Sequence, residues 1–206
     1  MLTQITVTLM GSPARPLLSM KLNVRQSHTF NQLYPPEASL EPQIHALRQW
    51  WGAEGHKAIE AISQHIGLTF AEQEIPAYIH NGPPGASSDP INISVKCELP
   101  LEHILIHELI HHLLSFNQQG YDEDRDSPPL YPDEEPSGAI HVIVHAIHEW
   151  YCLTHGQEDM IIRDIKSNKT LPAYARSWEI VQQEGYAKII AKLKQAIAKG
   201  HIRNSK

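Results

Sequence analysis

The segment from Leu101 to Phe116 constrains this chain more than any other part of the sequence. Its apolar residues surround the whole circumference of a helix instead of following one stripe, which predicts a helix that is buried on all sides. Pro100 suits the first helical turn, where its missing N–H is not needed, and Glu102 complements the positive end of the helix dipole. We therefore expect a helix inside the core.

The motif H-E-x-x-H, residues His107 to His111, lies inside this predicted helix. Two imidazoles four residues apart share one helical face, so both can reach one Zn²⁺ ion, and Glu108 can reach a water molecule on that ion. Polar groups in a buried helix must find partners, because an unpaired imidazole or carboxylate is costly there. The pattern predicts His107 and His111 as zinc ligands and Glu108 as the catalytic general base.

The alternative interpretation is a metal-free core helix whose histidines bond to backbone carbonyls. It would have to explain histidine, glutamate and histidine in the order and spacing that zinc hydrolysis uses, so we favour the metal site. His103 and His112 are assigned to structural roles. His112 points about 100° away from His111, so the two cannot bind one ion from the same face.

A second predicted helix, at residues 137–155, is the source of the missing ligand. A catalytic zinc ion needs three protein ligands and an open position for water. Glu149 lies at the edge of a polar stripe on this helix, and the other sides are apolar, so the stripe faces either solvent or the metal. The stripe consists of His141, His145, His148, Cys152 and His155.

The two segments together resemble the gluzincin group of zincin metallopeptidases, in which H-E-x-x-H lies on one helix and a glutamate on a following helix completes the metal site. The resemblance covers residues 103–155. It implies His107 and His111 as zinc ligands, Glu108 as general base and acid, and Glu149 as the third ligand.

The surroundings of Glu149 depart from this pattern. The gluzincin glutamate usually belongs to a signature such as N-E-x-x-x-D or E-x-x-x-D, and Leu153 stands at that offset here. His145 is therefore a rival third ligand, with Glu149 then orienting a ligand imidazole, and His148 is a further alternative. The metzincin pattern is absent, because glycine and histidine do not follow His111 at the required offsets.

The expected fold class is α+β, a mainly helical zincin-like domain with a small N-terminal sheet. The 206 residues suit one domain, in which residues 1–98 hold the N-terminal strands and helix and residues 99–206 form the helical part with the metal site. We expect a hairpin over residues 3–24 and a helical region over 41–66, broken near Gly52 to Gly55. Strands are expected at 75–80 and 91–95. By resemblance, one of these two strands forms the rim of a substrate cleft.

The connection between the two site helices, residues 117–138, is acidic, rich in proline and long. Its length indicates a lid, a specificity loop or a disordered segment. Helices are expected beyond it at 159–167, 172–183 and 186–199. The basic residues of the last helix are assigned to a solvated face.

The expected activity is zinc-dependent hydrolysis of a peptide bond, with a peptide or protein as substrate. Glu108 accepts the proton of a water molecule and later delivers it to the leaving nitrogen. The oxyanion donor stays open among His148, Tyr151 and His155. The alternative is a non-catalytic zinc-binding regulatory or interaction module, although a structural zinc site has no need of Glu108.

Composition narrows the partners and the compartment. A net charge of −6 argues against a nucleic-acid groove, which needs a concentrated basic surface. The sequence contains no run of 18 or more apolar residues, so no membrane span is expected. The N-terminus lacks the positive region of a secretory signal, and Cys97 and Cys152 imply no disulfide framework, so a cytoplasmic location is expected.

Overall fold

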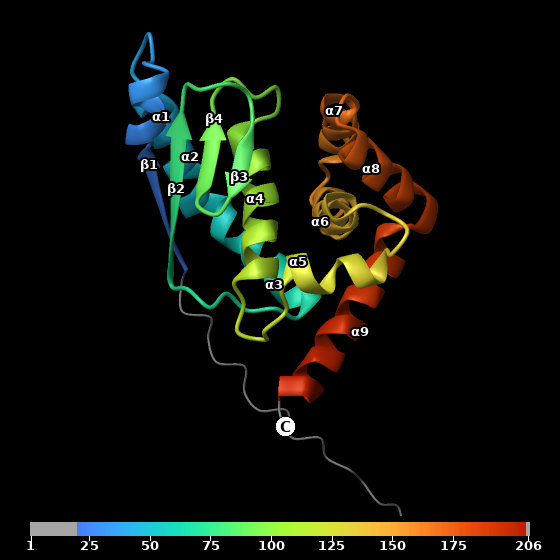
Figure 1. The fold of residues 1–206 in the computed structure, drawn as a ribbon. Coiled ribbons are helices and arrows are strands. Elements are labelled where there is room, and N and C mark those ends of the chain that lie inside the picture. The colour runs from blue at the N-terminus through green and yellow to red at the C-terminus, as the bar shows by residue number, and fades with distance from the viewer. Residues whose placement is uncertain (1–19, 205–206) are drawn as a thin grey trace, which may run out of the picture.

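The structure is a computed structural model that describes residues 20–204. A small sheet and helix α2 lie on one side of helix α4 (Leu101–Ser115), and helices α6 to α9 lie on its other side (Figure 1). The described chain is mainly helical with one small sheet, so the α+β class is confirmed.

The sheet has four strands in the order β1, β2, β4, β3. β1 (Lys21–Gln26), β2 (Glu74–His80) and β4 (Ile91–Ser94) are parallel neighbours, and β3 (Ala86–Ser88) pairs antiparallel with β4. The strands expected at 75–80 and 91–95 are thus present. Most of the hairpin expected over residues 3–24 lies outside the described residues, while β1 pairs with β2 and not with a preceding segment of the described chain.

The N-terminal half contributes three helices, α1 (His28–Leu33), α2 (Glu41–Trp50) and α3 (His56–Ile66). The break expected near Gly52 to Gly55 is wrong in form, because a π-helical turn (Trp51–Gly55) joins α2 to α3 without interruption. A Cβ atom at Gly55 would lie 2.6 Å from the Trp50 ring and 2.7 Å from the Trp51 ring, so these two indoles require glycine there.

The C-terminal half consists of α4 and a set of helices that follow it. The expected helices are present, and their ends differ from the expected ones by at most one residue, except that α9 extends further at its C-terminal end. After α4 come the short helix α5 (Glu123–Asp126), a 3₁₀ turn (Pro128–Leu130), α6 (Pro136–Thr154), α7 (Glu158–Asn168), α8 (Pro172–Glu184) and α9 (Tyr186–Asn204).

Helix α4 is the centre of the core, as its sequence predicts. Apart from the partly buried Leu101, its leucines and isoleucines are almost completely buried between the isoleucine-rich strands and helix α6. Helix α6 is buried over most of its length too. Within the described part of the chain, no helix is both long and apolar enough to cross a membrane.

Candidate metal centre

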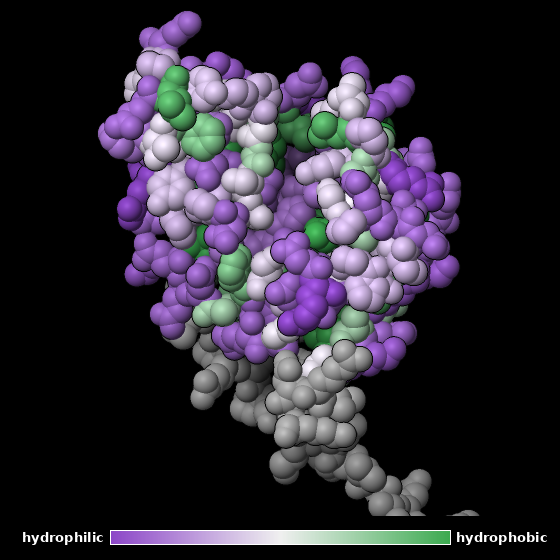
Figure 2. All heavy atoms as spheres, in the orientation of Figure 1, coloured by the Kyte–Doolittle hydropathy of each residue, from purple (hydrophilic) through white to green (hydrophobic). Residues whose placement is uncertain are grey.

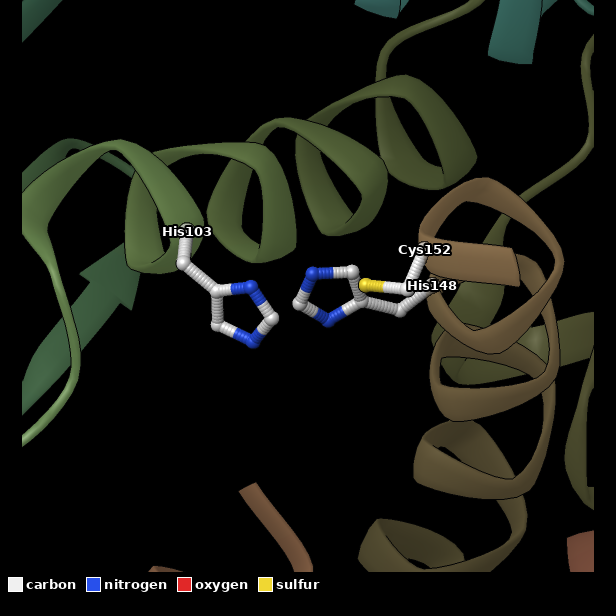
Figure 3. Close-up of side chains that lie close together, drawn as sticks. All are labelled: His103, His148 and Cys152. Carbon is white, nitrogen blue, oxygen red and sulfur yellow. The ribbon is translucent and has the colours of Figure 1, made fainter. Parts of the chain in front are cut away.

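Helices α4 and α6 each present three histidines to the other. The axis of α6 crosses that of α4 rather than running along it (Figures 1 and 3). The ring of His107 lies near the crossing, with centroids 5.6 Å from the rings of both His145 and His148. His111 meets His141 at 4.8 Å on one side, and His103 meets His148 at 4.1 Å on the other.

The structure brings His107 and His111 of the motif together with His141 of α6. One ligand atom of each lies within 4.8 Å of the others, a separation from which small side-chain movements can close around one ion. We call these three residues the HExxH cluster. Each of the three offers an imidazole nitrogen, the class of ligand that suits divalent zinc.

Two imidazoles of the HExxH cluster each have one ring nitrogen bonded to an oxygen outside the cluster. His111 Nδ1 donates to a carboxylate oxygen of Glu123 at 2.9 Å, and His141 Nδ1 donates to the carbonyl oxygen of Ser137 at 2.8 Å. Each contact fixes the tautomer that leaves Nε2 free as a ligand. Outer acceptors of this kind accompany most metal-binding histidines.

The charge of Glu123 also changes the protonation of His111. Burial would lower the pKa of His111, but the hydrogen bond from its ring and the negative charge of Glu123 outweigh burial and raise the pKa above its ordinary value. The pKa of His141 falls to about 4, because this side chain is buried and His111 lies close to it. Hence His141 is the neutral donor at neutral pH.

Glu108 is buried, with 8% of its surface exposed, and lies on the same pocket wall as the cluster. Burial raises its pKa to about 7, a change that nearby His111 opposes and the negative charge of Glu123 supports. A carboxyl group whose pKa lies near neutral pH can both accept and return a proton, which is what a general base and acid requires.

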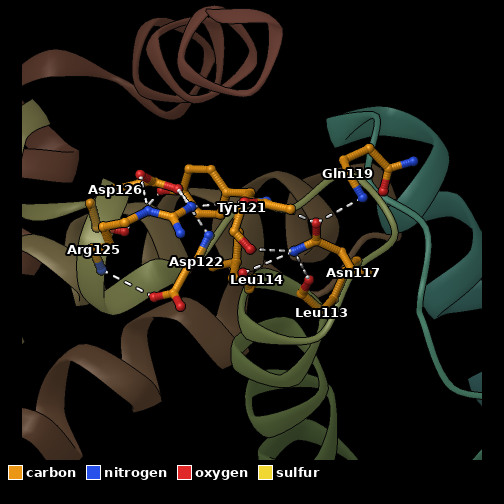
Figure 4. Close-up of polar contacts among 10 residues, drawn as sticks. Leu113, Leu114, Asn117, Gln119, Tyr121, Asp122, Arg125 and Asp126 are labelled. Carbon is orange, nitrogen blue, oxygen red and sulfur yellow. Dashed lines mark hydrogen bonds and ion pairs between the residues drawn. The ribbon is translucent and has the colours of Figure 1, made fainter. Parts of the chain in front are cut away.

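The acidic connection between α4 and α6 is ordered, and it positions Glu123. Asn117 Nδ2 donates to the carbonyl oxygens of Leu113 and Leu114 at the end of α4, both at 3.0 Å, and to that of Tyr121 at 2.9 Å (Figure 4). The Asn117 side-chain oxygen accepts from the Tyr121 amide at 3.1 Å. These contacts fix the turn that leads into α5, whose first residue is Glu123.

A pocket of about 750 Å³ runs along the HExxH cluster. The molecule is hollowed between its sheet side and its α6–α8 side, with hydrophilic residues in the depth of the hollow (Figure 2). Strand β3 forms part of the pocket wall, so the rim strand is neither of the two strands that the sequence suggested. The wall also contains Tyr174 of α8, whose ring contacts His141 at 3.8 Å between centroids.

Glu149, the first candidate for the third ligand, does not join the HExxH cluster. Among the described residues it belongs to no group of potential ligands and does not line the pocket. The crossing of the helices explains this. His148 already reaches the first turns of α4, at His103, and Glu149 lies one residue further on and about 100° round the helix.

His145, the rival candidate, lies deeper in the same stripe. Its Nδ1 is 2.9 Å from the hydroxyl oxygen of Ser177, and its ring stacks on Trp178 with centroids 4.4 Å apart. It is completely buried and forms no ligand group with the motif pair. His145 therefore packs against the HExxH cluster instead of belonging to it.

None of the three candidate oxyanion donors lines the pocket. His148 contacts His103 at the other end of the crossing, and His155 and Tyr151 contact each other on α6, with His155 Nδ1 2.8 Å from the Tyr151 carbonyl oxygen. Tyr174, in contrast, lines the pocket beside His141. The sequence carries no motif that marks it.

Comparison with family models, with curated proteins and with solved structures found no match to this chain.

Proposed function

We propose that this protein is a zinc-dependent hydrolase of peptide amide bonds with a zincin-like catalytic domain. The observation that carries the proposal is the convergence of three imidazoles and one buried carboxyl group of raised pKa in one pocket. The residues that would hold the metal ion are His107, His111 and His141.

The donor set fits a catalytic zinc ion better than a structural one. Three nitrogen ligands leave a position for water, and catalytic zinc sites have this composition. Zinc bound there would supply a Lewis acid that polarises the scissile carbonyl and lowers the pKa of a water molecule. A purely structural site would not need Glu108 in the pocket.

Glu108 performs the proton transfers in this proposal. Its carboxylate accepts the proton of the attacking water, and its carboxyl group later returns that proton to the leaving nitrogen. The hydroxyl group of Tyr174, which also lines the pocket, donates a hydrogen bond to the developing oxyanion. The pKa of Tyr174 is raised by burial and by the charge of Glu108, so its hydroxyl group keeps its proton.

The substrate class follows from strand β3. It is an edge strand, and within the described residues its outer edge has no strand partner. An extended peptide can pair with such an edge through main-chain hydrogen bonds, and this would place a peptide bond along the pocket.

Both cysteines are free thiols in the structure, in keeping with a reducing compartment such as the cytoplasm.

The test compares the zinc-loaded wild-type protein with Glu108→Gln on a mixed peptide library. We expect Glu108→Gln to bind zinc at the wild-type stoichiometry and to lose hydrolysis by about 10²–10⁴-fold, which is the usual contribution of a general base. His107→Ala should lose both zinc and activity. Equal hydrolysis by Glu108→Gln would overturn the mechanism, and a wild-type protein that binds zinc without cleaving peptides would favour a regulatory module.

A further inference from the structure

A second group of potential ligands lies beside the HExxH cluster and plays no part in the proposed mechanism. It consists of His103 of α4, His148 of α6 and Asp164 of α7, which we call the Asp164 cluster. All three side chains are more than nine-tenths buried, with 6%, 1% and 3% of their surfaces exposed. Three separate helices therefore bring polar groups together inside the protein.

Both imidazoles face the same oxygen of Asp164. His103 Nε2 lies 3.6 Å from Asp164 Oδ2, and His148 Nδ1 lies 3.7 Å from it. These separations exceed hydrogen-bond lengths of about 2.7–3.2 Å. They match the distance between two ligands of one metal ion, because bonds of about 2.1 Å at tetrahedral angles place the ligand atoms about 3.4 Å apart.

The hydrogen-bond partners of the cluster lead to the same conclusion. Within the described residues, His103 Nε2 and both ring nitrogens of His148 are buried without a hydrogen-bond partner. The other oxygen of Asp164, Oδ1, accepts a hydrogen bond from Asn168, which orients the carboxylate so that Oδ2 faces the imidazoles. In the described part of the chain no lysine or arginine pairs with Asp164.

We propose that His103, His148 and Asp164 bind a second divalent transition-metal ion. Two imidazoles and one carboxylate are donors that zinc, cobalt, manganese and iron accept. A cation would neutralise the buried carboxylate and would give His103 Nε2 and His148 Nδ1 a partner. His103 and His148 point toward each other from α4 and α6, and the Cys152 sulfur lies close to both rings (Figure 3).

The second ion would lie next to the catalytic one along a single pocket. His103 and Asp164 line the same pocket as the HExxH cluster. His107 has a ring nitrogen within 4.8 Å of ligand atoms of both His148 and Asp164, and it also belongs to the HExxH cluster, so it lies between the two clusters. The inference rests on different residues from the proposed function and stands or fails separately from it.

The experiment is a titration of the metal-free full-length protein with Zn²⁺, followed by removal of loosely bound metal and elemental analysis. We expect two equivalents in the wild-type protein and one in each of Asp164→Asn and His103→Gln. His111→Ala should also retain one equivalent, held by the Asp164 cluster. Circular dichroism verifies that each variant is folded.

His112→Gln is the matched control, because His112 is a buried histidine of the same helix whose two ring nitrogens already have partners, Ser88 and Glu72. It should retain two equivalents. The second site is overturned if the wild-type protein binds one equivalent that Asp164→Asn keeps, or binds two that Asp164→Asn and His103→Gln both keep. A single equivalent that Asp164→Asn loses and His111→Ala keeps would support the Asp164 cluster and reject the HExxH centre.

Discussion

The HExxH cluster and the Asp164 cluster use the same residue type on the same two helices, yet their imidazoles have different partners. In the HExxH cluster, His111 and His141 each donate one ring N–H to an oxygen outside the cluster. In the Asp164 cluster the carboxylate lies among the imidazoles, at 3.6 and 3.7 Å.

This difference separates two uses of a carboxylate. Glu123 accepts a hydrogen bond from the far nitrogen of a ligand ring and so orients that ring, whereas Asp164 presents an oxygen at ligand distance from two rings. In the proposed zinc site, the first arrangement would leave one position for substrate and water. The second offers the carboxylate itself as a ligand. Variants of the two clusters should therefore differ in what they lose.

The largest expected effect is that of His141→Ala. Removing a ligand should lower the zinc affinity of the HExxH cluster by more than about 100-fold, since removing only an outer partner of a ligand already costs about 10–100-fold. Competition with a chromophoric chelator measures the affinity. Glu149→Gln is the control and should bind zinc as the wild type does. Weakened zinc binding by Glu149→Gln together with wild-type binding by His141→Ala would restore Glu149 as the third ligand.

The metal-free protein should lose stability in acid. Burial lowers the pKa of both His145 and His148 well below their ordinary value, so these rings are neutral in the folded protein. Unfolded histidine has a pKa of about 6.5, and below that pH each ring should cost about 1.4 kcal/mol of stability per pH unit. This stability is fully present above pH 6.5.

Urea unfolding from pH 7.5 to 5 measures the effect. Removing His148 should flatten the pH dependence, and saturating zinc should displace it to lower pH. A free energy of unfolding that stays constant over this range would show that the rings are already protonated or solvated in the folded state.

Glu123→Gln should weaken zinc binding at the HExxH cluster by about 10–100-fold, because an amide oxygen is a poorer acceptor for the ring N–H than a carboxylate. It should leave the second equivalent bound by the Asp164 cluster. An equal loss of both equivalents would mean that Glu123 stabilises the fold as a whole and does not act by orienting the His111 ring alone. Differential scanning calorimetry of the metal-free variant separates these outcomes.

The smallest expected effect is that of Asn117→Ala. It removes the side-chain hydrogen bonds that fix the turn after α4, at a net cost of about 1 kcal/mol for each bond that water does not replace. Zinc affinity should fall less than in Glu123→Gln, because Glu123 itself remains. A larger loss of affinity than in Glu123→Gln would mean that the turn, and not the Glu123 carboxylate, determines the orientation of His111.

Sequence periodicity predicted the positions of the long helices and the face that the motif residues share. The apolar circumference of α4 predicted its burial, and the spacing of His107, Glu108 and His111 predicted which side chains share a face. These are local properties, fixed by neighbours in the chain. The same holds for β2 and β4, whose short isoleucine-containing runs are bounded by turn residues.

The partners of the motif could not be predicted, because they depend on how helices cross. Position along α6 decides that His141 meets His111, and no spacing within α6 contains that information. Glu123 and Asp164 come from a connection and from a separate helix. A second signal was overlooked, since His103, His107 and His111 repeat every four residues and predict a shared face.

Anomalous X-ray diffraction at the zinc absorption edge, on crystals of the zinc-loaded protein, would locate the proposed catalytic ion. We expect a peak about 2.1 Å from a ring nitrogen of each of His107, His111 and His141, with Glu108 beside the open coordination position. A peak bound by Glu149 in place of His141, or no peak within reach of His107 and His111, would contradict the proposed site.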